Sequence, residues 1–424
     1  MLIEYGTSNF LSFRDEAFLD LHPTKSKAIN RYPNNYITME TGERVLKTAV
    51  IVGENAGGKS NFVTSLVFLK DLLTRSNLPA KTYWNTLNSA NIESSANGSR
   101  DLSISNTKQE FSISVALGTS TLRLDIELDH KGVCSESLSV RRKKGGTDRR
   151  IYDLKRDGVV LRQEDEDSAD EPITLLEYSF SYDPEVGSIP AELVMSAREA
   201  SFESGRLAVI WLATIGEASC RSFIDAVTRD LLIARCVDGR FAVDDFDMGA
   251  VTSTMALPEY LDIVRLIDAS IESIVVDGEQ PMSESVIIRR DATGREYSRQ
   301  VREDSAGVRQ FLYWAYYIYQ VVYENKTVFA DEIDSAINPV LSDRVLAYIN
   351  GKDHRGQFIF TTHNIFNLTL RTNMKEQINF VTKDPATLSS SMYSLADFTD
   401  IRYDVKEELY EFYLKGALGG TVHA

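Results

Sequence analysis

Cysteine and histidine are scarce in this chain of 424 residues, which holds three Cys and five His. Cys134, Cys220 and Cys236 are widely spaced, so they provide neither a disulfide framework nor a Cys-x-x-Cys metal site. A few unpatterned cysteines suit a reducing compartment. The sequence therefore predicts a cytoplasmic protein and excludes a small secreted domain held together by disulfides.

Basic charge and long apolar runs are also in short supply. The chain has 46 Lys and Arg against 62 Asp and Glu, a net charge of -16. Proteins that bind nucleic acid alone usually carry a basic excess, so DNA or RNA would need a local patch or a partner. No apolar run approaches the roughly 18 residues of a membrane span, and residues 1–5 do not resemble a signal peptide. We expect a soluble protein that does not bind membranes.

The overall composition, with 43% hydrophobic and 25% charged residues, is that of an ordinary globular protein. Residues 111–142 alternate apolar and polar side chains, as an antiparallel meander does. Helical spacing dominates from about 191 to 269. We therefore predict an α/β fold with an N-terminal lobe at 1–190, a helical insertion at 191–270 and a C-terminal lobe at 271–424.

The most specific motif is Gly-Glu-Asn-Ala-Gly-Gly-Lys-Ser at 53–60, which follows an apolar strand and precedes a helix. The glycines let backbone N–H groups surround phosphate oxygens at a helix N-terminus. Lys59 adds a positive charge, and the Ser60 hydroxyl is a ligand for Mg²⁺. The predicted nucleotide-binding residues here are Gly53, Glu54, Asn55, Ala56, Gly57, Gly58, Lys59, Ser60 and Asn61.

Two further strands end in polar residues. The strand 327–330 is followed by Asp331 and Glu332, which predicts a magnesium ligand and a base that polarises the attacking water. The strand 357–361 is followed by His363, at the edge where α/β sheets place ligands. We expect Glu332 and His363 to be catalytic and Asp331 to bind metal together with Ser60.

A fourth segment, Asp-Ser-Ala-Gly-Val at 304–308, precedes a long helix. Ser305 is suited to cap that helix. A helix N-terminus also presents N–H donors to an anion, so capping and phosphate binding are compatible roles.

Taken in chain order, the four segments resemble the motifs of an ABC-type ATPase head: 53–60 resembles Walker A, 304–308 the signature, 329–332 Walker B and 361–363 the switch-histidine motif. Ser60 and Asp331 are 271 residues apart, as in the branch that includes SMC, RecF and overcoming-lysogenization-defect proteins rather than transporter cassettes. The segments 8–13 (Ser-Asn-Phe-Leu-Ser-Phe), 393–398 (Tyr-Ser-Leu-Ala-Asp-Phe) and 413–416 (Tyr-Leu-Lys-Gly) resemble small prokaryotic ATPases of abortive-infection and other anti-phage loci.

The resemblance implies a P-loop head with a central parallel sheet, an antiparallel β subdomain and a helical insertion. It also implies a homodimer in which ATP and Mg²⁺ lie between the Walker A of one subunit and Ser305 and Gly307 of the other. Ala306 and Val308 depart from the usual signature, which can slow hydrolysis. Gln109 is a weak candidate for the Q-loop glutamine.

Three functions remain open from the sequence. The first is a sensor or scaffold ATPase of antiviral defence that works with a separate effector, a nuclease or toxin. The second is a RecF-like or SMC-like repair ATPase that clamps DNA, and the third is a nucleotide switch with little turnover. Six cations at 141–150 form either a solvated hairpin tip or a weak phosphate contact. The aromatic residues at 311–323 form either core and dimer interface or a base-stacking surface.

Overall fold

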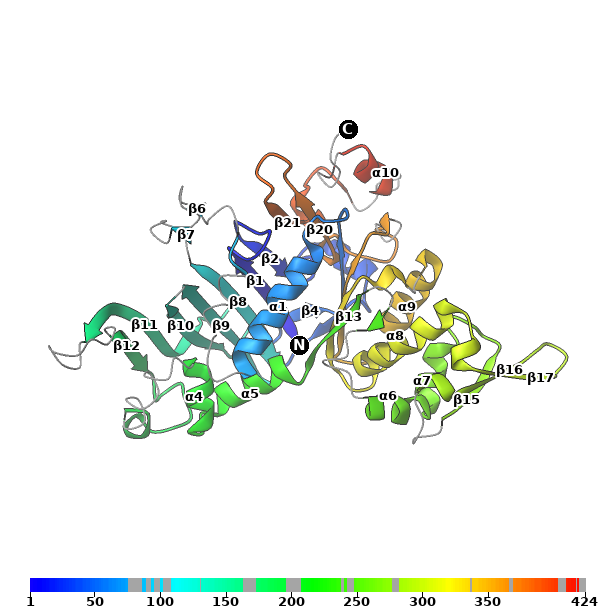
Figure 1. The fold of residues 1–424 in the computed structure, drawn as a ribbon, viewed down its shortest axis with the longest axis horizontal. Coiled ribbons are helices and arrows are strands. Elements are labelled where there is room, and N and C mark those ends of the chain that lie inside the picture. The colour runs from blue at the N-terminus through cyan, green and yellow to red at the C-terminus, as the bar shows by residue number, and fades with distance from the viewer. Residues whose placement is uncertain are drawn as a thin grey trace.

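The computed structural model describes residues 1–74, 86–88, 93–94, 100–101, 108–129, 131–162, 173–195, 207–237, 240–241, 248–276, 282–335, 338–365, 369–402, 409–416 and 418. Two seven-stranded sheets dominate this part of the chain, and helix α1 (Lys59–Thr74) runs between them (Figure 1). Within the ranges given, no helix has the length and apolar character needed to cross a membrane.

The first sheet is antiparallel throughout, in the order β12-β11-β10-β9-β8-β1-β2. It confirms the predicted meander and adds the N-terminal strands to it. Its strands are β1 (Leu2–Ser8), β2 (Ala17–Asp20), β8 (Gln109–Leu117), β9 (Ser120–Asp129), β10 (Gly132–Arg141), β11 (Arg149–Arg162) and β12 (Ile173–Tyr182).

The second sheet has the order β14-β13-β18-β19-β5-β20-β21 and contains the parallel core. Its five central strands are parallel, and the two edge strands run antiparallel to their neighbours. This confirms the α/β class with a central parallel sheet. The strands are β5 (Thr48–Val52), β13 (Leu231–Val237), β14 (Arg240–Phe241), β18 (Thr327–Asp331), β19 (Gln357–Thr362), β20 (Ile378–Lys383) and β21 (Ser390–Ser394).

Alternation along the parallel strands divides the apolar residues between two cores. Ala49 and Ile51 of β5 belong to the core that contains α1 and the antiparallel sheet. Val50 and Val52 belong to a second core around α8 (Ala306–Val322). Because successive strand residues face opposite sides, each parallel strand is apolar on both faces, as its sequence is.

The remaining helices cover these cores. Helices α4 (Ala208–Thr214) and α5 (Ala218–Thr228) belong to the first, and α6 (Met248–Met255), α7 (Pro258–Val264) and α9 (Pro339–Gly351) to the second. A three-stranded antiparallel sheet of β15 (Ile271–Val275), β16 (Val286–Arg290) and β17 (Glu296–Gln300) lies at the end of the molecule opposite β11 and β12 (Figure 1). The described residues also form the short strands β3 (Tyr36–Thr38), β4 (Arg44–Leu46), β6 (Glu93–Ser94) and β7 (Arg100–Asp101) and helix α10 (Leu409–Leu414).

One expectation for the middle of the chain is wrong. Helices do not account for all of 191–270, because β13 lies within it and pairs in parallel register with the Walker B strand β18. Its sequence, Leu-Leu-Ile-Ala-Arg-Cys-Val, is a short apolar run that periodicity alone assigns to a helix or a buried strand equally well. The division of the chain at 190 and 270 stays a prediction.

Candidate functional site

Three of the four motifs meet at the carboxyl edge of the parallel sheet. The Walker A loop follows β5, the Walker B acids lie at the end of β18, and His363 follows β19. Strand β19 lies between β5 and β18. Because the carboxyl ends of neighbouring parallel strands meet at one edge, residues about 300 positions apart in sequence form one cluster.

The Walker A loop is tightly enclosed, and its glycines are required. A Cβ on Gly53 would lie 2.2 Å from the carbonyl oxygen of Val381, and a Cβ on Gly58 would lie 2.5 Å from Ser390 Oγ. Gly58 has a φ of 118° and Ala56 has a φ of 61°, both in the left-handed region. This backbone leads directly into α1, where a helix offers N–H groups that have no intrahelical partner.

Lys59 is bent back onto the loop that precedes it. Its Nζ donates to the carbonyl oxygens of Gly53 at 2.7 Å and Glu54 at 2.9 Å. Burial lowers the pKa of Lys59 to about 8, although Asp331, Glu332, Asp334 and Glu54 all act to raise it. The ammonium therefore stands inside the loop, where phosphate oxygens would replace its carbonyl partners.

Ser60 and Asp331 come together as the sequence predicts. Ser60 Oγ lies 3.4 Å from Asp331 Oδ1, and the same oxygen accepts a hydrogen bond from Thr361 Oγ1 at 2.6 Å. Asp331 is buried, with 6% of its surface exposed. A hydroxyl beside a buried carboxylate supplies the hard oxygen ligands that Mg²⁺ prefers.

Glu332 occupies an unusual backbone position. Its φ is 56°, and its backbone N–H donates to Thr361 Oγ1 at 2.9 Å. A non-glycine residue in the left-handed region costs about 1–3 kcal/mol, and such residues cluster at active sites. Here the turn ends the strand at once and leaves the Glu332 side chain exposed beside the buried Asp331.

His363 contacts the Walker A lysine directly. Its Nδ1 lies 3.0 Å from Lys59 Nζ and 3.3 Å from the Gly53 carbonyl oxygen. An ammonium group can only donate, so Nδ1 accepts and the ring proton is assigned to Nε2. Asp334 fixes the turn, because its carboxylate accepts from the backbone N–H of His363 and from Thr362 Oγ1, each at 2.5 Å.

Segments from both ends of the chain enclose the loop. Ser12 accepts a hydrogen bond from Asn61 Nδ2 at 2.8 Å, and its carbonyl accepts from the backbone N–H of Ser390 at 2.7 Å. Ser390 Oγ donates to the Gly57 carbonyl at 2.7 Å. The spacing of the glycines at 53–58 does not reveal these partners, since nothing in 8–13 or 390–398 resembles a phosphate loop.

The structure does not bring the signature segment to this cluster. Ser305 caps α8, where its Oγ accepts from the Val308 backbone N–H at 3.3 Å, as predicted. Ser305 is exposed, and no described contact joins it or Gly307 to the Walker A loop. A Cβ on Gly307 would meet no atom within 4 Å, so the chain itself does not require glycine there.

Sequence reasoning missed Arg235 near the site, and the structure gives Gln109 a contact that the sequence does not reveal. Arg235 of β13 lies in register with Asp331 and donates to Thr64 Oγ1 of α1 at 2.7 Å. Gln109 is buried, and its Nε2 donates to the Asn9 carbonyl at 3.0 Å, so in this structure it holds the N-terminal segment. Only the recognition of β13 as a strand would have revealed Arg235.

The basic tip is partly neutralised within the chain. Arg141 pairs with Glu43 at 3.1 Å and Asp148 at 2.8 Å. Arg149 and Arg150 also pair with acidic residues. Among the described residues, only Arg142, Lys143 and Lys144 of this tip are exposed without an acidic partner.

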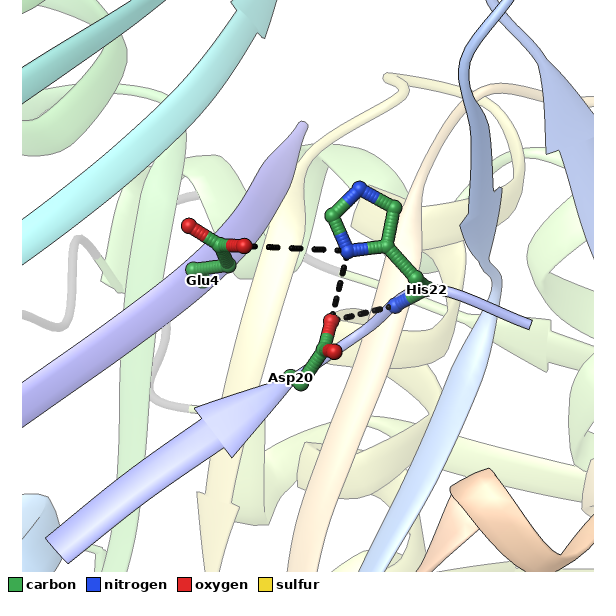
Figure 2. Close-up of side chains that lie close together, drawn as sticks. All are labelled: Glu4, Asp20 and His22. Atoms are coloured by element: carbon green, nitrogen blue, oxygen red, sulfur yellow. Dashed lines mark hydrogen bonds and ion pairs between the residues drawn. The ribbon is translucent and has the colours of Figure 1, made fainter. Parts of the chain in front are cut away.

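One further cluster of possible metal ligands lies on the antiparallel sheet (Figure 2). His22 Nδ1 lies 2.6 Å from Asp20 Oδ1 and 3.8 Å from Glu4 Oε1. The hydrogen bond to Asp20 raises the pKa of His22 despite partial burial. Arg123 also approaches Glu4, at 3.5 Å, so the carboxylates already have cationic partners and we interpret the cluster as an ion-paired histidine.

No protein-family model matches the sequence, and no curated protein matches it. Solved structures do match, each over 93% of this chain. They include the SMC head domain from Thermotoga maritima (12% identity, 98% of that chain, TM-score 0.43) and an SMC head bound to the C-terminal winged-helix domain of ScpA (12%, 97%, 0.42). A third is an SMC head with an extended coiled coil bound to the C-terminal domain of ScpA, derived from Pyrococcus furiosus (11%, 96%, 0.39). At these identities the likeness concerns the fold alone.

Proposed function

We propose that the protein is a Mg-ATP-dependent ATPase of the ABC type. The observation that carries this proposal is the convergence of Lys59, Ser60, Asp331 and His363 at one edge of the parallel sheet. These residues lie at or just beyond the carboxyl ends of three neighbouring strands. They have the chemistry that phosphoryl transfer needs: a cation, two oxygen ligands and a polar group that can take up a proton.

The enclosed loop fits a triphosphate. Lys59 and the N–H groups at the start of α1 would hold the phosphates, and the glycines leave no room for side chains there. Ser60 and Asp331 would bind Mg²⁺. When bound, the metal neutralises charge that develops on the phosphate oxygens.

Three other side chains would take part in the hydrolysis step, each in a different role. Glu332, exposed at the end of β18, would accept the proton of the attacking water. Thr361 orients the carboxylate of Asp331 and the backbone of Glu332 at once, because its hydroxyl contacts both. His363, held by Asp334, would sense the phosphate through Lys59 and Nε2.

The catalytic unit in this proposal is a head-to-head homodimer. Ser305 is exposed and Gly307 is partly exposed at the start of a helix, and no described contact joins them to the chain's own Walker A loop. The empty space around Gly307 is explained if the partner's nucleotide occupies it, since a methyl group would intrude there. A helix N-terminus then supplies donors to the γ-phosphate across the dimer interface.

For the cellular role, we favour a sensor or scaffold subunit in antiviral defence with a separate effector, a nuclease or toxin. The support is the resemblance of 8–13 and 393–398. Phe13 bridges to Ser390, the first residue of β21, and this strand leads into 393–398. A DNA clamp is the alternative, but a net charge of -16 and three unpaired tip cations give it little positive surface.

Replacing Glu332 with Gln tests the ATPase and the dimer together. The variant should bind Mg-ATP with parental affinity but hydrolyse it roughly 10²–10⁴ times more slowly, since proton transfer is lost. Unhydrolysed ATP should hold two chains together, so ultracentrifugation should detect a dimer in Mg-ATP and a monomer without nucleotide. Parental turnover in Glu332→Gln, or a monomer at saturating Mg-ATP, would sink this proposal.

A further inference from the structure

The start of α8 is tied to the three-stranded sheet by one ion pair. Arg289 of β16 places Nη2 2.7 Å from Oδ2 of Asp304, the residue that precedes Ser305. Oδ1 of Asp304 accepts a hydrogen bond from the Ser305 backbone N–H at 2.8 Å. The Asp304 side chain is only 7% exposed. One carboxylate therefore joins the sheet through one oxygen and the signature serine through the other.

Arg289 is itself held from a second side. Its Nε donates to Asp268 Oδ2 at 2.8 Å, and Asp268 also accepts from the backbone N–H and hydroxyl of Ser270. Burial alone would raise the pKa of Asp268, but the hydrogen bonds from Arg289 and Ser270 lower it. The planar guanidinium thus bridges two carboxylates in a fixed fork, which an ammonium group cannot reproduce.

The charge of Asp304 matters because of where it stands. It is adjacent to Ser305, which in the proposed dimer faces the triphosphate bound by the partner. A bare carboxylate there would repel the phosphates, and in a partly desolvated interface the repulsion exceeds its value in water. Arg289 both cancels this charge and fixes the backbone that presents Ser305.

We propose that Arg289 is a positioning residue for ATP-driven dimerisation, acting through Asp304 on the signature serine. This inference rests on the proposed ATP-bridged dimer. Arg289 has no described contact with the Walker A loop, so ATP binding by a single chain is independent of it. The two steps, nucleotide binding and dimerisation, are therefore separable by substitution.

The experiment uses the full chain carrying Glu332→Gln, in which the ATP-bound dimer accumulates. Adding Arg289→Ala should raise the dimer dissociation constant in Mg-ATP at least tenfold, measured by ultracentrifugation. ATP affinity of the dilute, monomeric protein should stay within twofold. Arg290→Ala is the matched control: Arg290 is the next residue of β16, and it pairs with Glu272 and Glu296 instead, so its loss should change neither quantity.

The outcomes separate the two proposals. Monomeric Glu332→Gln in Mg-ATP would overturn the proposed function and this inference with it. A dimer in Glu332→Gln that persists unchanged after Arg289→Ala would overturn the inference alone. If Arg289→Ala also loses ATP binding, its fold is impaired, and Arg289→Lys decides: severalfold weaker dimerisation supports the positioning role, and unchanged dimerisation contradicts it.

Discussion

In the proposed site, ATP binding should change the protonation of the Lys59 side chain, and this change can be measured. Burial lowers its pKa to about 8, and phosphate oxygens around the ammonium would raise the pKa again. Above pH 8 the Lys59 side chain is mostly neutral in the free protein, so it takes up a proton when ATP binds. The affinity for ATP should therefore fall as the pH rises above 8, by up to about tenfold per pH unit. Calorimetry in two buffers of different ionisation enthalpy measures this uptake directly.

The variant in which Lys59 is replaced by Ala is the control for that pH dependence. Lys59→Ala should weaken ATP binding by ~2–5 kcal/mol, because phosphate charge loses its side-chain cation. It should also abolish proton uptake above pH 8. Parental binding that takes up no proton between pH 8 and 9 would contradict the assigned role of this lysine.

At the level of single residues, the sequence was most informative where function restricts residue type. Ser60 and Asp331 lie close together, as their motifs predict, because each motif follows a recognisable apolar strand. Their roles in binding phosphate and metal stay predictions. Asp304 and Arg289 could not be predicted as a pair. An acidic residue before a helix and an arginine in a strand are common, and only the tertiary fold joins them.

Among the elements, the start of α8 offers the sharpest test of the dimer. Gly307 is the second residue of this helix and has open space around it. Gly307→Ala should leave the free energy of unfolding unchanged or raise it by up to about 1 kcal/mol, because Ala favours helix. The same methyl group should abolish the ATP-driven dimer if the partner's nucleotide lies against it.

The control for this substitution is Gly351→Ala at the end of α9, where an added Cβ also meets nothing within 4 Å. Denaturant unfolding and ultracentrifugation of both variants in Mg-ATP give the comparison. A Gly307→Ala protein that dimerises like its parent would mean that Gly307 does not face a nucleotide.

Helices and strands were predictable from the sequence where their apolar and polar residues follow a clear period. The alternating strands of the meander and the apolar strands before the motifs are found where period and turn residues place them. Strand β13 was missed because 231–237 is too short and too uniformly apolar for periodicity to separate strand from helix. Its partner β18 lies about 95 residues further along the chain, so the pairing has no local signal.

For the whole molecule, charge decides between a scaffold and a DNA clamp. Reversing Arg142, Lys143 and Lys144 to Glu should remove any contact with nucleic acid or an acidic partner and leave ATP turnover intact. Each neutralised phosphate contributes about 0.9 to the log–log salt slope, so three cations limit the slope to about -3 per subunit. Reversing the exposed Lys25 and Lys27 provides a control for charge alone.

The measurements are ATP turnover, DNA retention at two salt concentrations and phage protection in cells. Tight DNA binding by the parent that survives both high salt and the reversed tip would favour the clamp. Weak binding that disappears in both cases agrees with the scaffold.

The place of β5 in the sheet also affects the order in which the site can fold while the chain is being synthesised. The Walker A loop precedes in the chain the two strands that flank β5, which are β19 and β20, and it also precedes Ser390, which closes over the loop. A ribosome that has reached residue 350 carries the motif without either neighbour. We therefore expect the enclosed form of the loop, which the proposed nucleotide site requires, to arise only after residue 390 has left the exit tunnel.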